Sequence, residues 1–240
     1  MPEQVFSPNI AWYLFLAGAG SGAYIIASFF RFAKNFSSNP NFHEYQSIAQ
    51  GGFYLGPLIV LIGSLFLVFD LGSPQKAFLL LTTPRPTLLT AGTWFIVLFC
   101  ITAAATLFMR ADSGLAVPRL LDTLCGALSL LFAVAVMIYA GILFSSMSAL
   151  PLLHTPAVVV LLVVSALATG SAVITLYGFL NQQRKSILFS MRIIPKLDIS
   201  LIALEVLALL AVYFTTTTSI TLNRHGAPLL LKVWNWRYCC

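Results

Sequence analysis

Long apolar runs are the feature that most constrains the fold of this chain. Residues 156–180 read PAVVVLLVVSALATGSAVITLYGFL and contain no charged side chain. An α-helix needs about 20 consecutive apolar residues to cross the hydrocarbon core of a bilayer. Charged residues make up 8% of the sequence, whereas soluble domains contain about 25%. The runs are also unlike the alternating pattern of a transmembrane β-barrel. We therefore predict an all-α polytopic membrane protein that is embedded in the lipid bilayer.

The apolar runs predict a helical bundle of about six transmembrane helices. These predicted spans cover residues 9–30, 51–70, 88–109, 120–146, 156–180 and 198–217. Residues 1–217 would then form the membrane bundle. The remaining residues, 218–240, would form a C-terminal tail at the membrane interface, because their apolar part is too short to span a bilayer and is rich in Trp, Lys and Arg.

The basic residues predict the orientation of the bundle. Eight of the thirteen Lys and Arg residues fall in three segments on one side of the predicted bundle, namely 31–50, 110–119 and 181–197. Cytoplasmic loops carry an excess of Lys and Arg, so the N-terminus is expected outside. The net charge of +6 is thus explained by membrane topology, and it does not predict a nucleic-acid partner.

Three polar side chains are expected near the outer membrane face. Asn9 and Tyr13 are four residues apart, so one face of the first helix presents both. Tyr139 lies late in the fourth span, which runs outward, and it should reach the same depth. Tyr residues at this depth are often interfacial anchors. The alternative is that these side chains converge on a bound molecule.

Two acids and one arginine are further candidates. Glu205 lies about halfway along the sixth span, where an ionisable side chain is costly; it either handles protons or binds another helix. Asp70 ends the second span, where an acid opposes the helix dipole. Lys76 or Arg85 on the following loop could compensate its charge. Asp70 could therefore order this loop or take part in chemistry.

Several cofactors are not expected. The three histidines lie outside the predicted spans, whereas a membrane cytochrome of the b type holds its haem between histidines within helices. The four cysteines form no CxxC pair, so no metal site or disulfide framework is predicted. Gly18 and Gly22 form a GxxxG face, which is typical of close helix packing.

The order of several motifs resembles the NrfD-type, or polysulfide-reductase-type, membrane subunits. The residues that carry the resemblance are WYLFLAGAGSGAY (12–24), LGPLIVLIGSLFLVFDLGSPQKAF (55–78), PRPTLLTAGTWFIVLF (84–99), MIYAGILFSSMSALPLLHTP (137–156) and SALATGSA (165–172). The resemblance extends from about residue 9 to about residue 216, and the turn Asp-Leu-Gly-x-Pro after the second span is its most specific part.

The resemblance implies a function that composition does not. Such subunits anchor a respiratory oxidoreductase in the cytoplasmic (inner) membrane of a prokaryote and exchange electrons with menaquinone or ubiquinone. They carry no haem or metal of their own. A ferredoxin-like iron–sulfur subunit docks on one face, with a molybdopterin-type catalytic subunit beyond it.

The resemblance also suggests roles for the candidate residues. The quinone-binding positions would be Asn9, Tyr13 and Tyr139, near the outer ends of the first and fourth helices. Glu205, Asp70 and Arg85 would serve proton transfer or shape the rim of the site. The chain itself would be a quinone-reactive or a non-catalytic subunit. Two alternatives remain open at this point: an ion or solute transporter, and a structural anchor without a quinone site.

Overall fold

The described part of the chain consists of membrane-length helices. The computed structural model describes residues 8–36, 42–70, 88–111, 119–146, 156–180 and 198–214, all of them helical. The labelled helices are α1 (Pro8–Phe36), α2 (Phe42–Asp70), α4 (Leu88–Ala111), α5 (Arg119–Ser146) and α6 (Pro156–Leu180). Five helices within these ranges are long and apolar enough to cross a membrane. The predicted polytopic helical fold is confirmed. Residues 215–217 of the sixth predicted span, and the tail 218–240, lie outside the described residues.

Helices α1 and α2 are longer than the predicted spans. The segment 31–50 was expected to connect two spans, but α1 continues to Phe36 and α2 already begins at Phe42. The apolar criterion marks only the part of a helix that lies in lipid. The helix itself can continue beyond the lipid, because its backbone hydrogen bonds do not require apolar side chains. Arg31, near the end of α1, forms an ion pair with Asp122 of α5.

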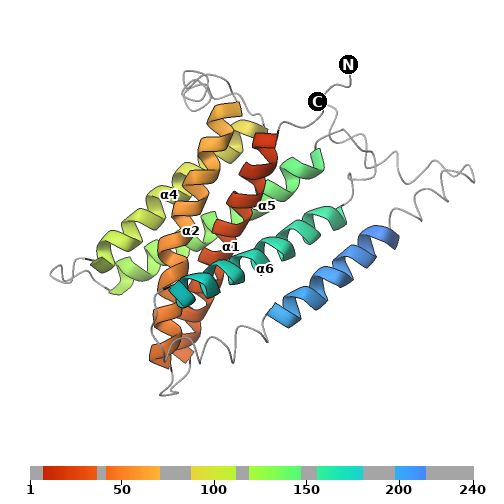
Figure 1. Ribbon diagram of the computed structural model, residues 1–240. Coiled ribbons are helices and arrows are strands. Elements are labelled where there is room, and N and C mark those ends of the chain that lie inside the picture. The colour runs from red at the N-terminus through yellow and green to blue at the C-terminus, as the bar shows by residue number, and fades with distance from the viewer. Residues whose placement is uncertain are drawn as a thin grey trace, which may run out of the picture.

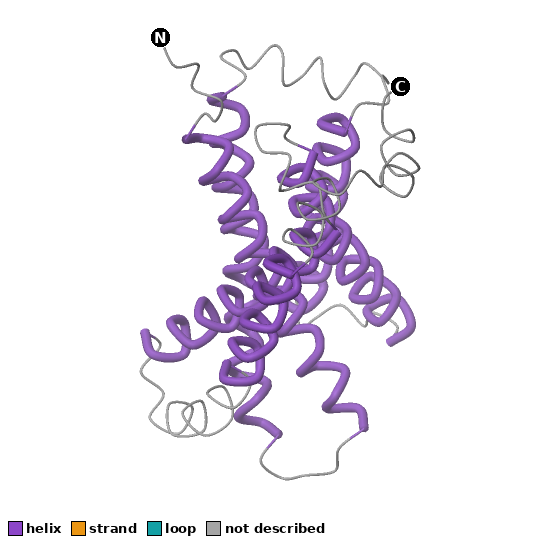
Figure 2. Tube along the Cα trace, turned by 90° about the vertical axis from the view of Figure 1, so that its right-hand side faces the viewer, coloured by secondary structure: helices purple, strands orange, loops and turns teal. Residues whose placement is uncertain are grey.

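Helix α1 lies at the centre of the bundle (Figure 1), in which every described element is a helix (Figure 2). It packs against α2, α5 and α6, while α4 packs against α5 and α2. All of the small residues from Ala17 to Ala23 are buried. In contrast, many large apolar side chains of the outer helices are exposed, such as Leu131 of α5 and Leu176 of α6. These exposed side chains suit contact with lipid.

Glycines allow α1 to approach two neighbours at backbone distance. A Cβ atom added to Gly20 would lie 2.6 Å from the carbonyl oxygen of Gly56 in α2. A Cβ atom on Gly22 would overlap the backbone carbonyl of Ala166 in α6, and one on Gly18 would lie 3.3 Å from the Ala166 Cβ. The expectation that Gly18 and Gly22 serve close helix packing is confirmed.

The helix 198–214 lies at the edge of the bundle, beyond α6 (Figure 1). The Ser171 hydroxyl of α6 donates a hydrogen bond to Asp198, the first residue of this helix. An acid at the start of a helix is also stabilised by the helix dipole. Most of this helix is exposed, so its outer face is available to lipid.

Gly22→Ala should destabilise the bundle, because the added methyl group meets backbone atoms of α6 and cannot be accommodated by a side-chain rotation. Overpacking of this kind costs about 1–3 kcal/mol. The thermal midpoint of the purified protein in detergent would measure the loss. Gly178→Ala is the matched control, since no atom lies within 4 Å of a Cβ atom there. Equal midpoints for the two variants would contradict the close α1–α6 contact.

Candidate functional site

The polar side chains of α1 that face the core lie in two separate places. Tyr13 and Tyr24 are both fully buried, and their separation of about three helical turns places them on one side of α1. Tyr13 lies near the start of α1, and Tyr24 lies toward the part that carries Arg31. We call these two ends of the bundle the Tyr13 end and the Arg31 end.

At the Tyr13 end, two tyrosine hydroxyls from different helices come together. Tyr139 of α5 is 4% exposed and belongs to the same buried cluster as Tyr13. The two phenol groups are close enough to interact. Neither hydroxyl, however, has a hydrogen-bond partner of good geometry among the described residues, although both oxygen atoms are fully buried. We call Tyr13 and Tyr139 the tyrosine pair.

Helices α2 and α4 pack against the tyrosine pair, whose members lie on α1 and α5. Because α1 starts at the end of the bundle where α5 finishes, an early residue of α1 meets a late residue of α5. The backbone of α2 also comes close, since a Cβ atom on Gly63 would lie 3.4 Å from the Tyr13 carbonyl oxygen. On the other side, the ring of Tyr139 lies directly against Gly92 of α4.

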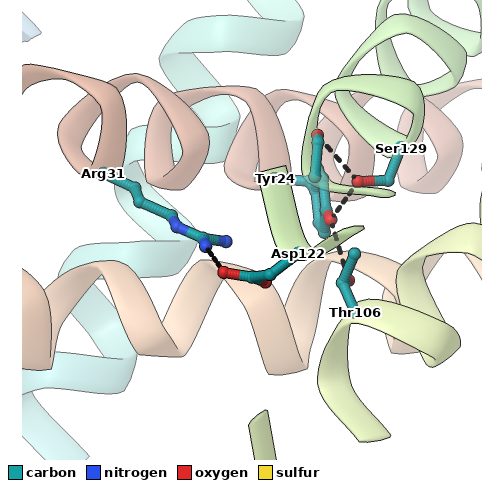
Figure 3. A network of polar contacts seen from close by, with 6 residues as sticks. Tyr24, Arg31, Thr106, Asp122 and Ser129 are labelled. Atoms are coloured by element: carbon teal, nitrogen blue, oxygen red, sulfur yellow. Dashed lines mark hydrogen bonds and ion pairs between the residues drawn. The ribbon is translucent and has the colours of Figure 1, made fainter. Parts of the chain in front are cut away.

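At the Arg31 end, the polar groups satisfy one another (Figure 3). The Tyr24 hydroxyl lies 2.6 Å from Ser129 Oγ of α5 and 3.3 Å from Thr106 Oγ1 of α4. The Ser129 and Thr106 hydroxyls also donate to carbonyl oxygens of their own helices. Tyr24 thereby links α1, α4 and α5 at one point in the core.

The charged pair Arg31 and Asp122 lies close to this cluster (Figure 3). Asp122 is in the first turn of α5, where the helix dipole favours a negative charge. Both side chains are 31% exposed, so the pair is partly shielded. It joins the late part of α1 to the start of α5.

The structure brings together only some of the predicted site residues. Tyr13 and Tyr139 meet, and Asn9 is half-buried one turn before Tyr13. Glu205 is half-buried on the helix 198–214, beyond α6 and apart from the tyrosine pair. The side chain of Asp70 and all of Arg85 lie outside the described residues, so their roles stay predictions.

The second polar group and the contact at Gly92 are not among the features predicted from the sequence. Arg31 was assigned to a loop, whereas it lies on α1 and pairs across the bundle with Asp122. One sequence signal could have indicated the cluster: Tyr24 repeats the position of Tyr13 three turns later on a helix of small residues. Nothing in the sequence marks Ser129 and Thr106 as its partners. Among the described residues, no group of His, Cys, Asp or Glu side chains could hold a metal ion.

Comparison with known proteins agrees with this architecture. The family model described as polysulphide reductase, NrfD matches residues 1–238. The chain belongs to the NrfD family. The match extends beyond residue 217 and includes most of the tail.

The chain is also similar to a curated protein. Over 191 residues it is 28% identical to the C subunit of the polysulfide reductase of Wolinella succinogenes. The aligned region covers 71% of the NrfD protein described here and 57% of the relative, so it spans less than two thirds of the relative's length. No solved structure gives a significant match.

The Tyr24–Ser129 bond should stabilise the bundle, and a double-mutant cycle can measure it. Hydrogen bonds between membrane helices contribute about 0.5–1.5 kcal/mol. We expect Tyr24→Phe and Ser129→Ala each to lower the unfolding free energy in detergent, and the double variant to lose less than the sum. Fully additive losses would show that the two hydroxyls are not coupled.

Proposed function

We propose that this protein is the membrane anchor subunit of a respiratory oxidoreductase complex and exchanges electrons between a membrane quinone and a docked iron–sulfur subunit. The quinone head-group would bind at the tyrosine pair. The observation that carries the proposal is the meeting of two buried hydroxyls, Tyr13 and Tyr139, that lack hydrogen-bond partners among the described residues.

An unsatisfied buried hydroxyl is costly. Leaving a buried donor without a partner costs about 1–3 kcal/mol, and here two such groups from distant parts of the sequence lie together. The Tyr24 cluster shows that helices α1, α4 and α5 can supply hydrogen-bond partners to a buried tyrosine. A ligand with acceptor oxygens would supply the partners that the tyrosine pair lacks.

A quinone matches the chemistry of this location. Its ring is planar and apolar, it dissolves in lipid, and its two carbonyl oxygens accept hydrogen bonds. Phenol hydroxyls donate such bonds and can also accept them when the bound quinone becomes a quinol. Because both hydroxyls are covered, the side chains at this end of α1, α4 and α5 must move aside for the ring to enter.

Family membership supports the proposed partners. The curated relative is named as one subunit of a polysulfide reductase, which indicates an assembly of several subunits for that protein. Here we propose an iron–sulfur subunit at the Tyr13 end and, through it, a molybdopterin-type catalytic subunit. By the positive-inside rule, the Tyr13 end would lie on the outer side of the cytoplasmic membrane of a prokaryote.

Reduction of a quinone to a quinol consumes two electrons and two protons. The electrons would come from the docked subunit, while the protons must reach the carbonyl oxygens. The hydroxyls of the tyrosine pair would hold the bound oxygens during this transfer. Asp70, the last residue of α2, and Arg85, on the segment that follows α2, would shape the rim. Glu205 is kept as a candidate proton carrier on a separate helix.

Tyr139→Phe should weaken binding of a quinol analogue about tenfold, because one hydrogen bond to the head-group is lost. The same variant should keep or raise the thermal midpoint, since it removes a hydroxyl that lacks a partner. Fluorescence quenching of the purified protein would measure affinity, and a thermal melt would measure stability.

Tyr24→Phe is the matched control for Tyr139→Phe. It removes a hydroxyl that is fully bonded within the core, so it should lower stability and leave the affinity unchanged. Saturable binding that Tyr139→Phe does not weaken would place the quinone elsewhere. Absence of binding by the folded wild-type protein and by its complex would instead favour a structural anchor.

A further inference from the structure

We propose that Gly92 is a positioning residue for the quinone site: its missing side chain sets where the Tyr139 hydroxyl lies. This inference rests on the proposed function, because it concerns the same site. It gives α4 a defined role in a site whose two hydroxyls come from α1 and α5. Gly92 would touch neither the quinone nor Tyr13.

The ring of Tyr139 occupies the space that a side chain at position 92 would need. A Cβ atom placed on Gly92 would overlap the Cζ, Cε1 and Oη atoms of Tyr139. Glycine destabilises a helix interior relative to alanine, and Gly92 lies in the second turn of α4. Glycine at position 92 instead leaves room for the phenol group of Tyr139.

Gly92 differs from the glycines that bring helix backbones together. At Gly22 and Gly170, an added Cβ atom would meet backbone atoms of the neighbouring helix. At Gly92, all three nearest atoms belong to the far end of one side chain. An alanine there can therefore be accommodated by a rotation of the Tyr139 side chain about its Cα–Cβ bond. That rotation would move the hydroxyl away from Tyr13 without separating the helices.

Gly51 offers a matched control in the same protein. A Cβ atom on Gly51 of α2 would overlap the ring of Tyr177 in α6, so Gly51→Ala also places a methyl group against a tyrosine ring. Tyr177 is outside the cluster that contains Tyr13 and Tyr139. The two substitutions are chemically identical, and only one of them acts on the tyrosine pair.

The experiment uses the full-length protein with 3-fluorotyrosine incorporated at position 139. We expect Gly92→Ala to shift the fluorine NMR signal without any ligand present, and Gly51→Ala to leave it in place. Gly92→Ala should also weaken quinol-analogue binding about tenfold, as expected when one hydrogen bond is lost. If Gly92→Ala leaves the fluorine signal unchanged, the positioning role is overturned. It is also overturned if the wild-type protein binds the analogue and the Gly92→Ala variant binds it with the same affinity.

Two further outcomes, a lower thermal midpoint and an absence of quinol-analogue binding, also have a defined meaning. If Gly92→Ala lowers the thermal midpoint of the wild-type protein, it should not lower that of a Tyr139→Leu variant, because leucine lacks the ring that clashes; an equal loss in both backgrounds would overturn the proposal. If neither the wild-type protein nor its complex binds a quinol analogue, the proposed function fails. The fluorine signal still decides whether Gly92 sets the position of Tyr139.

Discussion

Backbone contact between α1 and its neighbours α2 and α6 is the constraint on which the rest of the structure depends. Within a bilayer, burial of apolar surface gives helices little reason to associate, because lipid is equally apolar. Close packing and hydrogen bonds must hold them together. The small residues from Ala17 to Ala23 let α1 lie in the middle of the bundle. The side chains on the remaining face of α1 then point into the core between α4 and α5.

That geometry gives the two tyrosines of α1 opposite environments. Tyr24 meets Ser129 and Thr106 and holds three helices together. Tyr13 meets Tyr139, and neither hydroxyl has a hydrogen-bond partner of good geometry in the described part of the protein. The first arrangement satisfies its buried hydroxyl, whereas a buried hydroxyl without a well-formed hydrogen bond costs free energy. A protein can retain such a cost where the unsatisfied groups serve to bind a ligand.

Much of the fold could be predicted from the sequence. Apolar runs of helix length give the positions of the described spans, since a membrane imposes one length and one secondary structure. Which helices pack together is harder to predict from the sequence. The spacing of glycines indicated a close contact at Gly22, but it did not indicate that Ala166 would be the partner. The meeting of Tyr13 and Tyr139 followed from the direction of the helices and the depth of the two residues. Gly92 and Ser129 could not be assigned, because their roles depend on which side chain a neighbouring helix places beside them.

The central claim is that a quinone binds at the tyrosine pair. The most direct test is light-induced cross-linking of the protein, in its native membrane, with a quinone that carries a photoreactive group on its ring. We expect labelled peptides from the start of α1 and the end of α5, and loss of this labelling when excess unmodified quinone is present. Labelling confined to other helices, or labelling that unmodified quinone does not reduce, would contradict this claim.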